Sequence, residues 1–144
     1  MVGSKYGQVI PEFIERLNNG EHPLKIIGDG SHTRSFCYID DAVAMLKCMM
    51  ENDSCRGKTL NLGTQSPEVT IREVVELCIA VTGKNLGVYN LEDTSGSPVR
   101  RAPDMSLTTK LLNYESKVGL REGVSKTWDW YRENIFEGNE VSAR

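Results

Sequence analysis

Two short segments of this chain place arginine side chains next to tight turns. Residues 28–41 read GDGSHTRSFCYIDD, so that Arg34 follows a glycine turn. Residues 97–106 read SPVRRAPDMS, so that Arg100 and Arg101 lie between two prolines. A guanidinium group stays charged at any working pH, and its planar fork of donors matches the oxygens of a phosphate group. Both segments therefore predict local recognition of an anion. In the alternative interpretation these are ordinary surface or ion-paired arginines. The available acidic partners are Asp29, Asp40, Asp41 and Asp104.

No motif for the transfer of a proton or a hydride can be recognised in the sequence. The closest match to a dinucleotide-binding loop is Gly28-x-Gly30-x-x-Thr33, which lacks the third glycine and leads into a predicted strand instead of a helix. None of the five tyrosines has a lysine four residues later, so the Tyr-x-x-x-Lys pair that activates a substrate hydroxyl is missing. The four cysteines have no C-x-x-C spacing and there are only two histidines, so we expect reduced thiols and no metal site. The chain by itself is expected to have no catalytic residue.

The composition is that of one compact domain. The chain has 144 residues, of which 17 are basic and 20 acidic, with a formal charge of −3 and 39% hydrophobic residues. This apolar fraction is too high for wholesale disorder. Apolar runs are far shorter than the roughly 18–20 residues of a membrane-spanning helix, and the N-terminus has no signal-peptide core. We therefore expect a cytoplasmic protein that binds no membrane and, because its basic residues are dispersed, no nucleic acid.

Helices and short strands alternate along the chain, which predicts an α/β or α+β domain. Apolar residues spaced as on one helix face predict a helix from Val9 to Gly20. A capping box at Thr70–Glu73 predicts the start of another, which ends at Gly83. Further helices are expected after a cap at Asp40 or Asp41, after a cap at Ser106, and from about Leu120 to Ile135. Strands are expected at Leu24–Ile27, Phe36–Ile39, Thr59–Leu62 and within Leu86–Leu91, and the longest loop at residues 92–103.

In residues 28–41 and 97–106 the chain resembles the NAD-dependent epimerase/dehydratase family, the extended short-chain dehydrogenases that act on nucleotide sugars. The first segment is similar to the family's G-D-G-x-x-T-R-x-F-x-Y-V-D-D stretch, and the second to its P-x-R-R-x-P-D-x-S-x-x-x-x-L-x-Y stretch. The predicted helix from Val9 to Gly20 resembles the V-I-P-x-F-I element that precedes the first stretch. The resemblance runs from about Gln8 to about Phe136, in the family's order.

The resemblance implies an α/β fold: the C-terminal part of an extended short-chain dehydrogenase (Rossmann-like) fold, with the N-terminal NAD-binding domain absent. The NAD loop and the Tyr-x-x-x-Lys pair would lie before residue 1, so NAD is expected in the intact parent enzyme and not on this chain. Residues 1–136 would form the nucleotide-sugar-binding region, and residues 137–144 a flexible tail.

The function that the resemblance implies is substrate binding. The chain would be the substrate-binding portion of an NAD-dependent 4-epimerase, 4,6-dehydratase or UDP-glucuronate decarboxylase, and would not be catalytic alone. Its ligand would be a nucleotide-diphosphate sugar. The alternative is a non-catalytic nucleotide-binding or oligomerisation module.

The resemblance also assigns roles to single residues. Arg34 would reach the diphosphate of the nucleotide sugar, and Arg101 would contact phosphate or ribose. Ile27 would line the base pocket, at a position where many relatives carry an aromatic residue. The complete set of substrate-binding candidates is Arg34, Arg100, Arg101, Ile26, Ile27 and Asp104.

A missing NAD-binding domain would leave apolar surfaces exposed. The residues expected to lose their packing partner are Ala42, Met45, Met49, Leu60 and Leu62. Exposed apolar patches favour self-association, so we expect a homo-oligomer.

Overall fold

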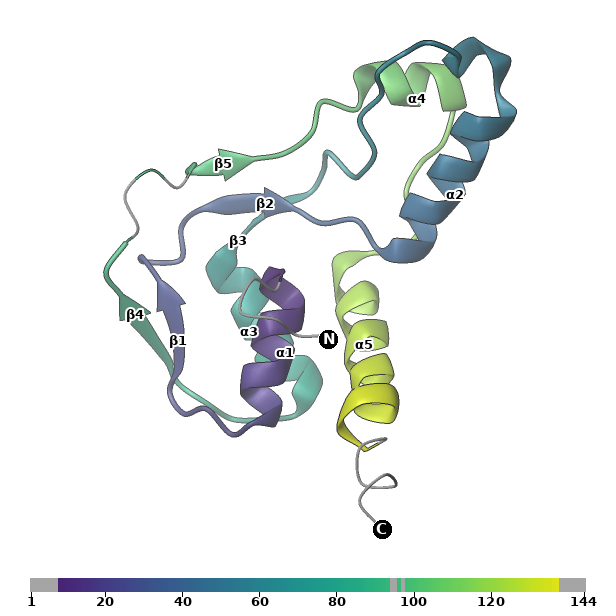
Figure 1. Cartoon of the computed structure of the whole chain (residues 1–144). Coiled ribbons are helices and arrows are strands. Elements are labelled where there is room, and N and C mark those ends of the chain that lie inside the picture. Colours follow the sequence, from purple (N-terminus) through teal and green to yellow (C-terminus); the bar gives the residue numbers. More distant parts are fainter. Residues whose placement is uncertain (1–7, 94–95, 97, 138–144) are drawn as a thin grey trace.

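The structure, a computed structural model, describes residues 8–93, 96 and 98–137. Its helices are α1 (Val9–Asn18), α2 (Ile39–Glu51), α3 (Ile71–Thr82), α4 (Ser106–Leu112) and α5 (Leu120–Tyr131), with a 3₁₀ turn at Asp53–Cys55 and a π-helical turn at Arg132–Phe136. Its strands are β1 (Leu24–Ile27), β2 (Thr33–Ser35), β3 (Glu68–Thr70), β4 (Val88–Leu91) and β5 (Arg100–Arg101). Figure 1 shows a body made of α1, α3 and α5 with β1 and β4, and an arm made of α2 and α4. Within the described residues, no helix is long and apolar enough to cross a bilayer.

The hydrophobic core lies in the body, where α1, α3 and α5 meet beneath β1. Apolar residues three and four apart turn one face of each helix inward. The fully or almost fully buried members are Phe13, Leu17, Leu24, Ile26, Val74, Val75, Cys78 and Val124. As expected, α3 begins at a capping box in which Thr70 and Glu73 exchange hydrogen bonds, and it ends at Gly83, which has a φ of 70°.

Two small sheets connect the elements. Strands β1 and β4 are parallel neighbours, with Leu24 opposite Val88. The second sheet has the order β3-β2-β5, with β2 antiparallel to β3 and parallel to β5. Strand β5 lies within the loop expected at residues 92–103 and places Arg101 directly opposite Arg34. The sheet therefore brings together the two arginine segments that are far apart in the sequence.

Two predicted strands are wrong. The strand expected at Phe36–Ile39 is instead β2, because Thr33–Ser35 are the residues that pair with β3 and β5, and α2 already begins at Ile39. Thr59–Leu62 forms no strand. There the Asn61 side chain donates to the Asp104 carbonyl at 2.8 Å, and the Asn61 carbonyl accepts from the Thr108 hydroxyl at 2.6 Å. These side-chain contacts with α4 and the residues before it take the place of a strand ladder.

Buried Asp41 joins the arm to the body. Asp41 is only 2% exposed. Its carboxylate accepts hydrogen bonds from the Tyr114 hydroxyl at 2.8 Å and from the backbone N–H groups of Lys117 at 3.0 Å and Val118 at 2.9 Å. The expected helix cap at Asp40 or Asp41 is wrong, since Tyr38 precedes α2 and no side chain caps the helix. The carboxylate instead holds the segment between α4 and α5.

The cap expected at Ser106 is also wrong. Met105 occupies the position before α4, and the side chain of Asp104 accepts a hydrogen bond from the Ser106 N–H at 2.9 Å. Asp104 therefore forms a turn just before the helix.

The exposed apolar face of α2 differs from the expected one. Met45 is 2% exposed, on a helix that contacts α4, and Ala42 and Met49 are half-buried. The expectation that Met45 lacks a packing partner is therefore wrong. Outside the helix, Leu60 is half-buried and Leu62 is exposed. The exposed apolar residues of α2 are Ile39, Val43, Leu46 and Met50.

Candidate functional site

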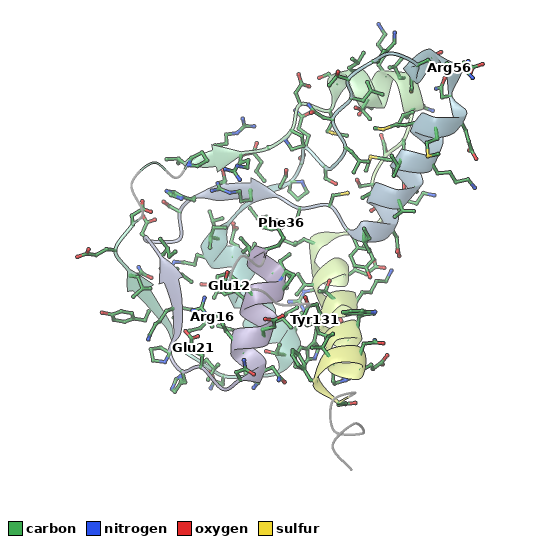
Figure 2. The ribbon with its side chains drawn as sticks, in the orientation of Figure 1. Glu12, Arg16, Glu21, Phe36, Arg56 and Tyr131 are labelled. Carbon is green, nitrogen blue, oxygen red and sulfur yellow. The ribbon has the colours of Figure 1, made fainter. Side chains whose placement is uncertain are left out.

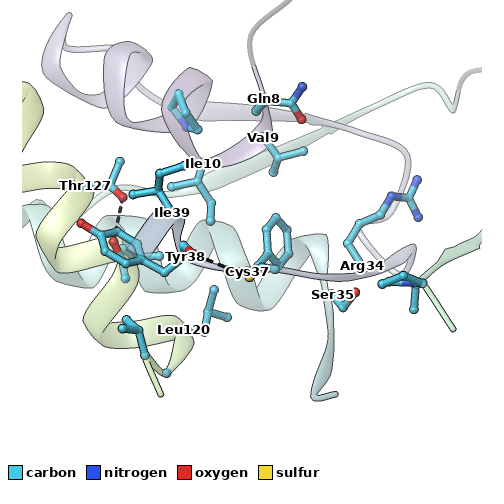
Figure 3. Close-up of a pocket in the computed structure, with 18 of the residues that line it drawn as sticks. Gln8, Val9, Ile10, Arg34, Ser35, Cys37, Tyr38, Ile39, Leu120 and Thr127 are labelled. Carbon is cyan, nitrogen blue, oxygen red and sulfur yellow. Dashed lines mark hydrogen bonds between the residues drawn. The ribbon is translucent and has the colours of Figure 1, made fainter. Parts of the chain in front are cut away.

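A cavity of about 900 Å³ opens between the start of α1, the connection from β2 to α2, strand β5 and one face of α5 (Figure 3). This volume falls within the roughly 300–1,000 Å³ of pockets that hold small ligands. The lining comes from residues 8–11, 34–39, 62, 101–103, 118–120, 123, 124, 127 and 130. No single stretch of sequence forms it, so the fold assembles the cavity.

One end of the cavity carries two arginines. Arg34 and Arg101 are opposite each other on neighbouring strands, and side chains in register share one face of a sheet. The Arg34 guanidinium donates to the carbonyls of Thr33 at 2.7 Å and Val99 at 3.3 Å. Within the described residues, neither Arg34 nor Arg101 forms an ion pair with a carboxylate. Two positive charges without a counter-charge thus converge on the cavity.

The N-terminus of α1 borders the same cavity through Gln8, Val9, Ile10 and Pro11. Gln8 precedes the helix and makes no side-chain cap. The N–H groups of a first helical turn have no partner within the helix, and the helix dipole adds partial positive charge there. Such an end binds phosphates and other anions, so it adds to the field of the two arginines.

Arg100 points away from this cluster. Its Nε donates to Oε2 of Glu68 at 2.8 Å and to Oε1 at 3.0 Å, and Thr33 bonds the same carboxylate. The hydrogen bond from Arg100 lowers the pKa of Glu68 below its ordinary value. Arg100 therefore ties β5 to β3 across β2, and this contact supports the strand on which Arg101 sits.

The glycine turn before β2 is shaped by its neighbours. Gly28 and Gly30 have φ values of 70° and 81°, in the left-handed region that glycine adopts at little cost. A Cβ on Gly30 would lie 2.8 Å from Cδ1 of Ile26, so a side chain does not fit there. The Gly30 carbonyl accepts from the Arg72 N–H at 3.0 Å, and the His32 carbonyl from the Ile71 N–H at 2.9 Å. These hydrogen bonds to the start of α3 fix the position of the turn and of β2, the strand that carries Arg34.

The other candidate residues lie elsewhere. Ile26 is 1% exposed and belongs to the hydrophobic core, whereas Ile27 is 58% exposed on the other face of β1. Neither lines the cavity, and neither does Asp104, whose pKa is lowered by its hydrogen bond to Ser106. The structure therefore brings together Arg34 and Arg101 and leaves Arg100, Ile26, Ile27 and Asp104 outside the cavity.

Sequence reasoning missed the wall that α5 contributes. Leu120, Gly123, Thr127 and Trp130 are three or four residues apart and form one helix face along the cavity. This spacing is visible in the sequence, but Gly123 and Thr127 interrupt the apolar pattern that would predict a buried helix face. A Cβ on Gly123 would lie 3.2 Å from the ring of Tyr38, so the glycine lets this tyrosine lie close against α5.

Comparison with known proteins matches this architecture to one family. The model of the NAD dependent epimerase/dehydratase family matches residues 2–63. UDP-glucuronic acid decarboxylase 1 of Arabidopsis thaliana is 34% identical over 134 residues, which cover 93% of this chain and 30% of the relative. Along almost its whole length the chain is therefore similar to members of the NAD-dependent epimerase/dehydratase family. It spans about a third of the length of the curated relatives that it matches.

Solved structures agree with the assignment and confirm the expected α/β fold. An epimerase from Methanothermobacter thermautotrophicus superimposes with a TM-score of 0.87 at 31% identity, over 96% of this chain and 41% of that one. A UDP-glucuronic acid 4-epimerase from Bacillus cereus, solved in complex with UDP-glucuronic acid and NAD, gives a TM-score of 0.78 at 26% identity, over 88% of this chain and 40% of that one. The chain thus has the fold of part of an extended short-chain dehydrogenase.

Proposed function

We propose that this chain binds a nucleoside diphosphate sugar in the cavity, with the diphosphate between Arg34 and Arg101. The observation that carries the proposal is the pairing of two arginines in register on β2 and β5, both without a carboxylate partner in the described residues. Two guanidinium groups and the start of α1 match the charge and the oxygen atoms of a diphosphate. The sugar would extend toward the α5 face of the cavity.

The contribution of the chain to a reaction is positioning. A clamped diphosphate leaves the sugar little freedom, which lowers the barrier of a following step by holding the reacting carbon in place. We propose that the chain is the substrate-binding portion of an NAD-dependent nucleotide-sugar epimerase, dehydratase or decarboxylase. Residues 1–136 would form this portion, and the tail assigned to residues 137–144 lies almost wholly outside the described residues.

The turn at Gly28–Gly30, the closest match to a dinucleotide-binding loop, does not fit a site for NAD. The turn at Gly28–Gly30 leads into β2, so no helix N-terminus follows it to receive a pyrophosphate. In the proposal NAD is therefore held by a different part of a longer enzyme. Bound NAD would supply the hydride chemistry, and the residues described here would orient the sugar.

Isothermal titration calorimetry tests the phosphate role. UDP-glucose, UDP-glucuronic acid and dTDP-glucose are titrated into the wild-type chain and into the variants Arg34→Ala and Arg101→Ala. Each substitution removes a charge-assisted hydrogen bond, which is worth about 1.5–3 kcal/mol and predicts binding about tenfold to a hundredfold weaker. Uridine alone is expected to bind all three proteins equally, because it lacks the diphosphate.

Arg56→Ala is the matched control. Arg56 lies at the far end of the arm (Figure 2), its side chain is 86% exposed, and it pairs with Asp53 at 3.0 Å. This variant should bind like the wild type. Equal affinity of all four proteins for every nucleotide sugar would show that the arginines do not hold the diphosphate. Affinity for uridine that equals affinity for UDP-glucose would contradict the proposal in the same way.

A further inference from the structure

Strand β5 carries Arg101 but has little backbone support of its own. It consists of Arg100 and Arg101, both of which are exposed, and it lies at the edge of the sheet beside β2 (Figure 1). Just before the strand, the Val99 carbonyl accepts a hydrogen bond from the Thr33 N–H at 2.8 Å. A ladder of two residues adds few backbone hydrogen bonds, and exposed segments with few such bonds open most easily. The position of Arg101 therefore depends on side-chain contacts of its neighbours.

A side-chain contact joins β5 to β3 over the strand between them. Arg100 Nε donates to Oε2 of Glu68 at 2.8 Å and to Oε1 at 3.0 Å, and its Nη2 also donates to Oε1. Thr33 is opposite Arg100 in the register of β2 with β5, and its hydroxyl donates to Oε2 of Glu68 at 3.4 Å. The guanidinium group is a rigid planar fork, so two nitrogen donors on one carboxylate fix its orientation as well as its distance. The contact therefore holds Arg100 and the backbone that leads to Arg101.

The two faces of this sheet have different roles. Arg34 and Arg101 are in register on the face at the cavity, whereas Arg100 meets Glu68 on the opposite face and neither of these two lines the cavity. We propose that Glu68 is a positioning residue, which acts through Arg100 to keep Arg101 in register with Arg34 and so raises the affinity for the diphosphate. The inference rests on the proposed function, which places the diphosphate between the two arginines.

The charge of Glu68 by itself would have the opposite effect on binding. The hydrogen bond from Arg100 lowers the pKa of Glu68, so the carboxylate is ionised at neutral pH. A negative charge on this sheet repels a diphosphate, and its removal would strengthen binding by Coulomb's law. Loss of the alignment of Arg101 would instead weaken binding. Glu68→Gln keeps the size of the side chain and removes its charge, so the sign of the change in affinity separates the two effects.

Isothermal titration calorimetry with UDP-glucose measures this sign. Glu68→Gln and Arg100→Gln should each weaken binding about threefold to fivefold, the upper part of the range for partly exposed ion pairs. The double variant should bind no more weakly than either single variant, because both substitutions break the same contact. The Arg100 side chain is 63% exposed, so Arg100→Gln is expected to fold. Asp53→Asn is the matched control, since it removes a carboxylate that pairs with Arg56 at 3.0 Å at the far end of the arm, and it should leave binding unchanged.

Combined substitutions test the route through Arg101. In an Arg101→Ala background Glu68→Gln should no longer weaken binding, because the residue that it positions is missing. In an Arg34→Ala background it should weaken binding as in the wild type. Unchanged or tighter binding by Glu68→Gln alone would overturn the inference, and so would an equal loss in the Arg101→Ala background. If Arg34→Ala and Arg101→Ala themselves leave the affinity for UDP-glucose unchanged, the proposed function fails, and the role of Glu68 fails with it.

Discussion

Replacement of Asp41 by asparagine tests the joint between the arm and the body. Asparagine has the same size and retains Oδ1, which accepts from the Tyr114 hydroxyl and the Lys117 N–H in the wild type. It puts an NH2 group at the position of Oδ2, 2.9 Å from the Val118 N–H. Two donors then face each other in a site that is 2% exposed.

The magnitude follows from these contacts. The substitution removes one hydrogen bond to a charged group, worth about 1.5–3 kcal/mol, and weakens the other two. We therefore expect Asp41→Asn to lower the free energy of unfolding by about 2–4 kcal/mol, a large fraction of the roughly 5–15 kcal/mol that stabilise a typical domain. Because Val118 lines the cavity, binding of a nucleotide sugar should weaken as well.

The cost of the substitution should depend on pH. Burial raises the pKa of Asp41, but hydrogen bonds from the N–H groups of Lys117 and Val118 and from Tyr114 outweigh burial and hold the pKa below its ordinary value. The stabilisation is therefore present above the pKa of an unfolded aspartate, about 3.9, and is lost as the pH falls through the lower folded-state value. The difference between wild type and variant should shrink below about pH 4.

Urea unfolding followed by circular dichroism at pH 7 and at lower pH measures both effects. Asp53→Asn is the control, because this aspartate is 87% exposed and its ion pair with Arg56 is worth less than about 1 kcal/mol. If Asp41→Asn costs no more than Asp53→Asn at pH 7, the proposed role of the buried carboxylate is refuted. If the loss of unfolding free energy in Asp41→Asn stays constant down to acid pH, the conclusion that Asp41 is ionised in the folded protein is refuted.

Two further predictions concern the body. Gly30→Ala should lower the melting temperature more than Gly57→Ala. Both glycines have a positive φ (81° and 70°), but only at Gly30 would the new Cβ meet another atom, Cδ1 of Ile26 at 2.8 Å. Equal shifts of the melting temperature would show that this close approach is unimportant. Glu21 accepts from Arg16 Nε at 2.8 Å and Nη2 at 2.7 Å (Figure 2), and these hydrogen bonds lower the pKa of Glu21 to about 2. Its stabilisation should be present above the unfolded value of about 4.3 and disappear as the pH falls toward about 2, so the stability gap between wild type and Glu21→Gln, followed by urea unfolding, should close over that range.

Helices were predictable because their signals are local. The apolar spacing that begins at Val9, the capping box at Thr70 and the left-handed Gly83 all lie within a turn or two of the elements they define. Hydrogen bonds of a helix join residues four apart, so a short window of sequence contains most of the information. Strand β1 was predictable for a related reason, since a short apolar run before a glycine turn is a strong local pattern.

The short strands and the buried carboxylate were not predictable in the same way. A strand as short as β2 or β5 exists only through partners elsewhere in the chain, and the apolar pattern at Phe36–Ile39 says nothing about which residues are paired. Asp41 reads as a helix cap from its neighbours along the chain. Only the return of the Tyr114–Val118 segment makes it a buried acceptor of three hydrogen bonds.

The sequence alone determined the helices of the body and the family that the chain resembles, and it predicted an anion site at two arginine segments. The tertiary structure decided which arginines share a site. Arg100 and Arg101 are adjacent in the sequence, but successive side chains of a strand point to opposite faces, so one pairs with Glu68 while the other joins Arg34 at the cavity. That choice depends on the register between β2 and β5, which is a non-local property of the folded chain.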